Sequence, residues 1–573
     1  MGVGRGARTS RRLGLMLLLA WATACHGDRA PELVLHNGVV LTMDEAVPEA
    51  SGFAVRGERI IAVGSDDEVL VLAGESTRVI DLRGKTVVPG FNDSHLHALA
   101  VPPGSLPVDH IASVDELLMA LRDKAQTTPR QDWIVGYGYD DTALGRHLDR
   151  FDLDKVSTDR PVLAWHASLH LMAVNSHALE VAGIGPETPD PEGGFFYRDK
   201  DRRPTGLLSE RSALESLFSK RQPSPLPHDL RSALGGLETF YVQMLSRGIT
   251  SIGDALVPPE LALAYWLSSP EKAGVRVNLM LDAESLKAAK WLLRVNDFAA
   301  WFGYHPLDNE WLRARTVKVF HGLSLSGRTA RLYQPYVDRP DYFGLEPQRS
   351  QEQLNRLVRE IHEAGFQAAV HSNGDYEIDM VLDAIEEAVG DGEMDHRHRI
   401  AHGTVVNPKI LAQMRDLRVV LAPHSYIFEK GPMLEAYGER RWDWMIPNAS
   451  SFEYGIPNAG NSDFPVSAAE PLLRIQSLVT RRSRQGKVYG PRQRLSVEQA
   501  LHVFTMGGAY ASFEENQKGS ISEGKFADFV VLSQDPRAVP PESIAQIQVE
   551  QTFVAGVKRF DRSGSGEKDF AQE

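Results

Sequence analysis

Cysteine is almost absent from this chain, since Cys25 is the only one among 573 residues. A lone cysteine cannot form an internal disulfide, so a disulfide framework is excluded. Internal repeats and long low-complexity segments are also missing. The apolar run from Leu13 to Ala24 is shorter than the roughly 20 residues that a membrane-spanning helix needs. A transmembrane anchor is therefore the weaker interpretation of this run.

The sequence also lacks an excess of basic residues. The net charge is −14 and is spread along the chain, which argues against nucleic acid as a partner. Hydrophobic residues make up 42% and charged residues 24% of the chain, an ordinary globular composition that supplies a sizeable core. The length is sufficient for one large domain and a smaller one.

The N-terminus has the layout of an export signal. Gly4–Arg12 carries arginines and no acidic residue, the apolar run follows, and small residues precede Cys25. This layout predicts a signal peptide over residues 1–24. The position of Cys25 directly after Ala24 resembles a bacterial lipoprotein cleavage site, at which the cysteine becomes lipidated. The alternative is a plain secretory signal with an incidental cysteine, and Ser10–Leu13 also resembles a twin-arginine signal.

Short β-rich runs punctuated by glycine stand at both ends of the remaining chain. Ile60–Val63 is an example near the N-terminus, and Phe529–Leu532 is an example near the C-terminus. Neither end alone has enough strands to bury a face. We therefore expect residues 25–86 and 511–562 to pair into one small β-sandwich, followed by a polar tail over residues 563–573.

Strand-like and helix-like segments alternate between these two ends. Examples are the strand-like Thr316–Phe320, the helical stretch Ser350–Ala364 and the strand-like Phe366–His371. Such alternation implies a parallel sheet, which predicts an α/β fold with a (β/α)8 TIM barrel over residues 87–510. Because such a barrel typically takes about 250 residues, we also expect an insertion near the barrel mouth, at about residues 102–227.

Metal-ligand side chains stand at the ends of several of these strands. His95 and His97 are two residues apart, so both lie on one face of a strand, which suits a divalent metal such as zinc. Two further apolar runs end in His371 and His402, and Asp463 follows a short segment. Each residue alone is more often structural. Their repetition at four strand ends indicates ligands for one or two divalent ions.

These motifs resemble the amidohydrolase superfamily, in the branch called amidohydrolase family 3, which includes enzymes similar to N-substituted formamide deformylase. The resemblance covers nearly the whole mature chain. The motifs that carry it are Pro89–Phe91 with His95-x-His97, Pro189–Gly194, Pro204–Leu208 and the closing motif Lys518–Phe529. His170 with Val174–Ser176 is similar to that branch too, which makes His170 a candidate substrate-binding residue.

The resemblance implies a role for each ligand. His95 and His97 would bind the first metal ion, and His371 and His402 the second position. Asp463 would be both a ligand and the general base. The expected cofactor is one or two divalent ions, with zinc as the expected metal, although His and carboxylate ligands also accept Fe, Mn or Co.

Lys318 matches the lysine that such enzymes can carry as a carbamate bridging two metal ions. Without the resemblance, Lys318 would be interpreted as a partly exposed strand-end lysine, because a free lysine is protonated at neutral pH and is a poor ligand. The sequence departs from the family pattern twice. Gly322–Leu323 stands where an Asp-Gly pair usually follows the lysine, and Ala401 stands where Glu is common. Neither departure removes a ligand.

The expected chemistry follows from these ligands. A divalent metal lowers the pKa of a bound water from 15.7 to about 7, and Asp463 would move the proton to the leaving group. The first hypothesis is a hydrolase that attacks a non-peptide C–N bond (amide, cyclic amide or N-formyl group) of a small molecule. The alternatives are an esterase, lactonase or phosphotriesterase on the same metal site. A lipid-anchored binding protein without catalysis is a third reading.

The export signal generates the first prediction. The mature protein should begin at Cys25 and should partition with the bacterial cell envelope, attached to the membrane only through its lipid. Mass spectrometry of the N-terminal peptide and fractionation of cells measure both properties. An intact Met1 on soluble cytoplasmic protein would contradict this prediction.

Overall fold

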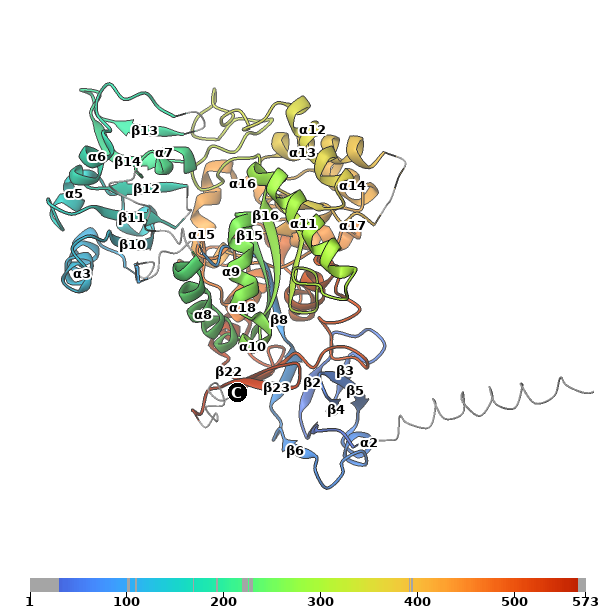
Figure 1. The fold of residues 1–573 in the computed structure, drawn as a ribbon. Helices are drawn as coiled ribbons and strands as arrows, with labels where there is room; N and C mark the ends of the chain where they lie inside the picture. Colours follow the sequence, from blue (N-terminus) through green and yellow to red (C-terminus); the bar gives the residue numbers. More distant parts are fainter. Residues whose placement is uncertain are drawn as a thin grey trace, which may run out of the picture.

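The computed structural model describes residues 30–564, except residues 100–103, 109–110, 168–169, 192–193, 219–224, 226–229, 391 and 393–394. The expected signal peptide, Cys25 and residues 565–573 of the expected tail lie outside the described residues. Within the described part, no helix is both long and apolar enough to cross a bilayer. Figure 1 shows a barrel in the centre, a β-domain below it and an inserted domain at its upper left.

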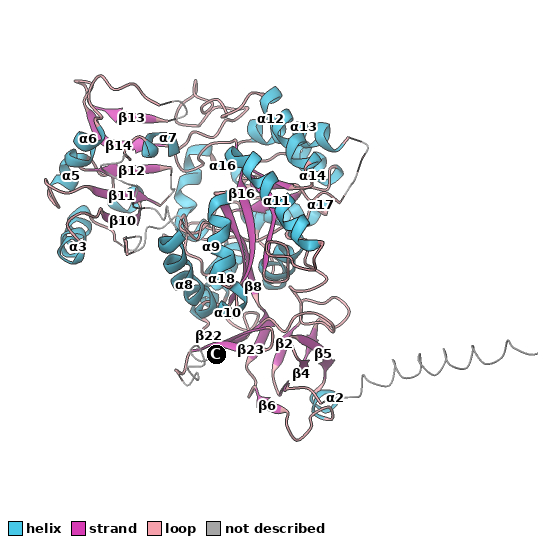
Figure 2. Cartoon of the chain, viewed as in Figure 1, coloured by secondary structure: helices cyan, strands magenta, loops and turns pink. Residues whose placement is uncertain are grey.

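The centre of the molecule is a parallel barrel, as predicted. Its seven hydrogen-bonded strands run in the order β20-β19-β18-β17-β16-β15-β8, and every pairing is parallel. Helices cover the outer face of the strands (Figure 2). Nearly all residues of the strands are buried, as expected of a barrel whose interior is filled by side chains. The strands are β8 (Phe91–Leu96), β15 (Ile249–Val257), β16 (Arg276–Asp282), β17 (Leu312–Phe320), β18 (Gln367–Ser372), β19 (Arg399–His402) and β20 (Val420–Pro423).

An irregular segment closes the barrel in the position of the eighth strand. Leu421 in β20 forms a parallel bridge with Asn458. On the other side, Ser94 N donates to the carbonyl of Gly460 at 3.0 Å, and Asp463 N donates to the carbonyl of His95 at 2.9 Å. The segment therefore hydrogen-bonds to both edge strands, and the (β/α)8 architecture is complete.

Amphipathic helices surround the strands. In α12 (Gln351–Glu363), Ser350 caps the first turn in a capping box with Gln353, and the buried residues Leu354, Val358 and Ile361 share one face at helical spacing. The sequence predicted this helix within one residue at each end. The other long outer helices are α8 (Leu230–Ser246), α11 (Leu286–Ala300), α13 (Asp375–Val389), α14 (Pro408–Asp416) and α18 (Pro471–Thr480).

Shorter helices complete the barrel. They are α9 (Ala262–Leu267), α10 (Pro270–Ala273), α15 (Ile427–Lys430), α16 (Glu439–Trp442), α17 (Asn448–Tyr454), α19 (Val497–His502) and α20 (Gly508–Ala511). A π-helical turn over Val503–Gly507 joins α19 to α20. The carbonyl of Val503 accepts the hydrogen bond from Gly460 N at 2.8 Å, so this turn supports the closing segment.

Strands from both chain ends form the β-domain. One sheet has the order β5-β4-β1-β6, and the other has the order β23-β22-β21-β7-β2-β3. The second sheet joins N-terminal and C-terminal strands, because β7 pairs with β21. The strands are β1 (Leu33–His36), β2 (Val39–Leu41), β3 (Glu49–Ala50), β4 (Gly52–Arg56), β5 (Arg59–Gly64), β6 (Arg78–Asp81), β7 (Thr86–Pro89), β21 (Phe529–Leu532), β22 (Val549–Val554) and β23 (Val557–Asp561), with α2 (Asp66–Leu70) beside them.

The inserted domain lies between β8 and α8. Its six strands have the order β13-β14-β12-β11-β10-β9. They are β9 (Leu106–Pro107), β10 (Ile134–Tyr139), β11 (Val162–His166), β12 (Leu171–Val174), β13 (Phe195–Arg198) and β14 (Pro204–Ser209). Its helices are α3 (Val114–Thr127), α4 (Asp141–Leu144), α5 (Arg150–Asp154), α6 (Ser176–Ala182) and α7 (Arg211–Glu215). Two apolar clusters, one containing Trp165 and one containing Tyr139, give this domain its own core.

A buried ion pair fastens the barrel to the β-domain. Arg276, the first residue of β16, donates through Nε to Asp528 Oδ2 at 2.7 Å and through Nη2 to Oδ1 at 3.2 Å. The guanidinium lies between the rings of Phe526 and Trp311, at 3.7 and 4.2 Å from their centroids. Asp528 also accepts from Ala555 N at 2.8 Å. The closing motif at Asp528 is thus part of a bidentate contact away from solvent.

This pair generates the second prediction. Asp528→Ala leaves the Arg276 charge buried without its partner, so we expect the free energy of unfolding to fall by about 3–5 kcal/mol. Glu310→Ala is the matched control, because it breaks the Arg59–Glu310 pair between the same two bodies, whose side chains are 41% and 47% exposed. An exposed pair contributes about 0–1 kcal/mol. Denaturant titration measures both, and equal small losses would contradict the prediction.

Candidate active site

All six ligand candidates from the sequence lie at one end of the barrel. Parallel strands bring their carboxyl ends to the same edge, where barrel active sites are built. The residues are His95 at the end of β8 and His97 after it, Lys318 near the end of β17, His371 in β18, His402 at the end of β19, and Asp463 in the closing segment. All are buried except His97, which is partly exposed.

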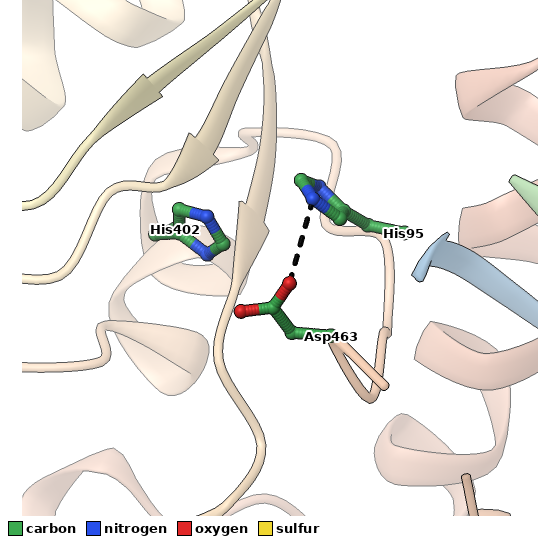
Figure 3. A group of neighbouring side chains, drawn as sticks. All are labelled: His95, His402 and Asp463. Carbon is green, nitrogen blue, oxygen red and sulfur yellow. Dashed lines mark ion pairs between the residues drawn. The ribbon is translucent and has the colours of Figure 1, made fainter. Parts of the chain in front are cut away.

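Asp463 is the centre of this group. Its Oδ1 lies 3.3 Å from His97 Nε2 and 3.6 Å from His95 Nε2. Figure 3 shows the carboxylate turned toward His95, with the His402 ring on the other side of it. One ligand atom from each of His95, His402 and Asp463 falls within a group in which all atoms are at most 4.8 Å apart.

The orientation of His97 fixes its tautomer. Its Nδ1 lies 3.0 Å from the carbonyl oxygen of Ala255, which can only accept a hydrogen bond. Nδ1 therefore carries the hydrogen, and Nε2 of the neutral ring presents a lone pair to Asp463. Two acceptors at 3.3 Å repel each other unless a proton or a metal ion lies between them.

Three imidazole rings lie next to one another in the site. The ring of His402 lies 4.4 Å from that of His371 and 4.1 Å from that of His424. His371 Nε2 faces the carbonyl of Leu323 at 3.3 Å. Nδ1 of His402 is buried without a hydrogen-bond partner among the described residues. A buried imidazole nitrogen without a partner is costly in protein and is satisfied by a metal ion.

Sequence reasoning missed His424. It follows β20 directly, and its Nδ1 lies 4.0 Å from Asp463 Oδ2. The signal was present, because Val420–Ala422 is an apolar run that leads to a histidine, as in the runs before His371 and His402. His424 is therefore one more nitrogen donor on the same side of the site.

Burial sets the charge of these groups. It is the largest cause that lowers the pKa of His95, His371 and His402 well below the usual value, and neighbouring cations add to it. The same effect lowers the pKa of His424 to about 4. The imidazoles are therefore neutral at neutral pH, the form in which they bind metal ions.

Lys318 lies inside the site rather than at its rim. It is 1% exposed, and its Nζ is 2.9 Å from His95 Nε2. Burial lowers the pKa of Lys318 to about 7, against the opposing charge of Asp463. The alternative interpretation, a partly exposed strand-end lysine, does not hold, because Lys318 lies on a strand that is buried and is itself buried.

The departure at Gly322–Leu323 has a structural reason. A side chain at Gly322 would lie 2.4 Å from Glu377 Oε2. Glu377 is fully buried and accepts backbone hydrogen bonds from Leu323, Arg331, Asn373 and Gly374 at 2.8–3.0 Å. This carboxylate ties the loops after β17 and β18 together, and only glycine leaves room for it. For Ala401, which is buried, the structure shows no corresponding contact.

The inserted domain contributes His170 to the barrel mouth. Its ring lies 5.9 Å from His371 and 5.5 Å from Phe320. His170 Nδ1 pairs with Glu210 Oε2 at 2.7 Å. Burial lowers the pKa of His170, but the charge of Glu210 and its hydrogen bond more than offset this, so the net shift is upward. The expected substrate-binding residue His170 therefore lies beside the expected ligand His371, although these two residues are about 200 positions apart in the sequence.

The residues present fit a divalent metal. Neutral imidazoles and an ionised carboxylate are the ligand types that zinc and similar ions prefer. A metal ion would satisfy both the facing acceptors of His97 and Asp463 and the unpartnered His402 Nδ1. His95, His97, His402 and Asp463 would hold it, with Lys318 within reach.

Comparison with known proteins agrees with this interpretation of the site. Residues 78–559 match the model of the Amidohydrolase family. The chain is 30% identical to YtcJ of Bacillus subtilis over 547 residues, 92% of this chain and 99% of that protein. It is 28% identical to N-substituted formamide deformylase of Arthrobacter pascens, over 93% of this chain and 99% of that protein.

A solved structure shares the fold over almost its whole length. It is an uncharacterized metal-dependent hydrolase from Pyrococcus horikoshii, 25% identical, with a TM-score of 0.69 over 89% of this chain and 99% of that one. The family match extends from β6 to β23 and so includes the barrel, the insertion and five of the ten strands of the β-domain. On this evidence, the chain belongs to the amidohydrolase family.

Proposed function

We propose that this protein is a metal-dependent hydrolase that attacks a non-peptide C–N bond of a small molecule. The observation that carries the proposal is the buried Asp463 carboxylate, which faces His97 Nε2 at 3.3 Å and His95 Nε2 at 3.6 Å. A base beside metal ligands is what water-based hydrolysis requires and what a simple binding site does not. The deformylase relative supports the C–N class.

His95, His97, His402 and Asp463 hold the first ion in this proposal, with zinc as the expected metal. His371 supplies a second position, and His424 is a further nitrogen donor beside it. A bound divalent ion supplies an acidic water and polarises the carbonyl group of the substrate. A carbamate on Lys318 would turn a buried amine into an oxygen ligand, and its place 2.9 Å from His95 supports this role.

Asp463 moves the proton. Although burial raises its pKa, the close contact with His97 and the interaction with Lys318 bring the pKa below the usual value. The carboxylate is therefore ionised at neutral pH, and it can accept a proton from the attacking water and pass it to the leaving nitrogen. Its backbone has a left-handed φ of 54°, and that of His402 has 75°. Such backbone in non-glycine residues is uncommon and is concentrated at functional sites.

The inserted domain binds the substrate in this proposal. Glu210 holds the His170 ring at the barrel mouth, so His170 can contact a polar group of the substrate opposite the metal ligands. The exported, lipid-anchored location is part of the same proposal and rests on the N-terminal signal alone. An ester, lactone or phosphotriester fits the same ligands, so the assay includes them.

The third prediction concerns the metal. Purified protein should contain at least one divalent ion per chain, and a chelator should abolish hydrolysis until the ion is restored. His95→Ala should lose the ion and the activity together, because it removes a ligand. His305→Ala, an exposed histidine outside this site, is the matched control and should keep both. Elemental analysis and a screen of amides, N-formyl compounds, esters and phosphotriesters make the measurement. Full activity of metal-free protein would end the proposal.

The fourth prediction separates the roles of Asp463. Asp463→Asn keeps the size of the side chain and one oxygen, so metal content should change little. If Asp463 is the base, kcat should fall by roughly 10²–10⁴-fold, the contribution of general acid–base catalysis. Metal content, Tm and kcat are measured on one preparation, with the best substrate of the screen. A lower Tm with near-normal kcat would instead make Asp463 structural.

A further inference from the structure

A second group of metal-ligating side chains lies in the inserted domain. Asp141, His147 and His166 each offer one ligand atom, and these atoms all lie within 4.8 Å of one another. None of them belongs to the barrel. The group combines two imidazoles with one carboxylate, which is a frequent set of three protein ligands for zinc and similar ions.

The topology explains why these residues meet. β10 and β11 are parallel neighbours in which Tyr139 pairs with His166, so the carboxyl ends of both strands lie at one edge of the sheet. His166 is the last residue of β11, and Asp141 begins α4 directly after β10. The chain after α4 then returns and brings His147 to the same edge.

The distances match a metal centre. Asp141 Oδ1 lies 2.9 Å from His166 Nε2, and Oδ2 lies 3.6 Å from His147 Nε2. In a tetrahedral zinc site with bonds of about 2.0–2.1 Å, neighbouring ligand atoms are about 3.3–3.4 Å apart. One observed separation is shorter and the other longer than this value, and they involve different oxygens of the carboxylate, so the side chains rotate to bind one ion.

The surroundings suit an ion as well. Tyr139 OH lies 3.5 Å from His147 Nδ1 and can accept its hydrogen, which leaves Nε2 for a metal. Lys430, the last residue of α15, pairs with the neighbouring Asp140 at 2.9 Å. His166 is 4% exposed, whereas the Asp141 side chain is 37% exposed, so the site has a fixed inner ligand and an open side for entry.

We infer that Asp141, His147 and His166 bind a divalent transition-metal ion of the zinc class, at a site separate from the barrel mouth. Three protein ligands leave one position for water or another small ligand. The ion would fasten the loop after β10 to the end of β11, on the edge of the inserted domain that Lys430 joins to the barrel. This inference does not depend on the proposed hydrolysis.

The test is a count of zinc ions on the full chain. The protein is stripped with a chelator and titrated with Zn²⁺ by calorimetry, and bound zinc is counted by elemental analysis. His147→Ala and Asp141→Ala each remove a ligand, so each variant should bind one ion fewer per chain than the wild type, or bind that ion more than about 100-fold more weakly, because even an outer partner is worth 10–100-fold in affinity. His177→Ala, which changes a histidine in α6 of the same domain, is the matched control and should bind as the wild type does.

A second background separates the two sites. With His95 and His97 both changed to alanine, adding His147→Ala should lower the zinc content by one further ion per chain. The Tm of each metal-free variant, compared with metal-free wild type, shows that the fold is kept. Equal zinc stoichiometry and affinity with and without His147 would overturn the inference and leave Asp141, His147 and His166 as a hydrogen-bonded polar cluster.

Discussion

The hydrogen bond from Asp463 N to the carbonyl of His95, at 2.9 Å, joins the last position of the barrel to the first. About 370 residues of chain separate these two positions, so the bond exists only when the barrel has closed. It sets the Asp463 carboxylate beside the two β8 histidines. The geometry of the site is therefore a consequence of closure, and anything that opens the barrel between β8 and the closing segment removes the site.

Closure of the barrel also buries ionisable side chains away from water. Neutral imidazoles tolerate burial, which is why the wall of the site consists of histidines rather than lysines or arginines. Lys318 and Asp463 are buried as well, and both approach His95 Nε2, at 2.9 Å and 3.6 Å. A cation between the ligands compensates the carboxylate and satisfies the ring nitrogens at once. The same electrostatic requirement explains why Glu377 accepts four backbone hydrogen bonds instead of a cation.

Much of this arrangement could be predicted from the chain alone. Apolar runs that end in histidine located β18 and β19, and the His-x-His spacing located β8, because strand ends of a parallel barrel meet. The same pattern before His424 was available but was interrupted by Pro423. Contacts between distant residues could not be predicted. The Ala255 carbonyl that orients His97 is 158 residues away in the sequence. The carboxylate that requires glycine at position 322 belongs to Glu377 in α13.

The barrel and the inserted domain contribute different residues to the barrel mouth. Every candidate ligand at the mouth belongs to the barrel, whereas His170 and Glu210 belong to the inserted domain. A substitution in the insertion can therefore change what is bound without disturbing the groups that hold the ion. The converse does not hold, because Phe320 and His371 support the His170 ring from the barrel side. On the proposed function, changes in the insertion therefore alter the contacts with the substrate, while the groups that hold the ion stay on the barrel.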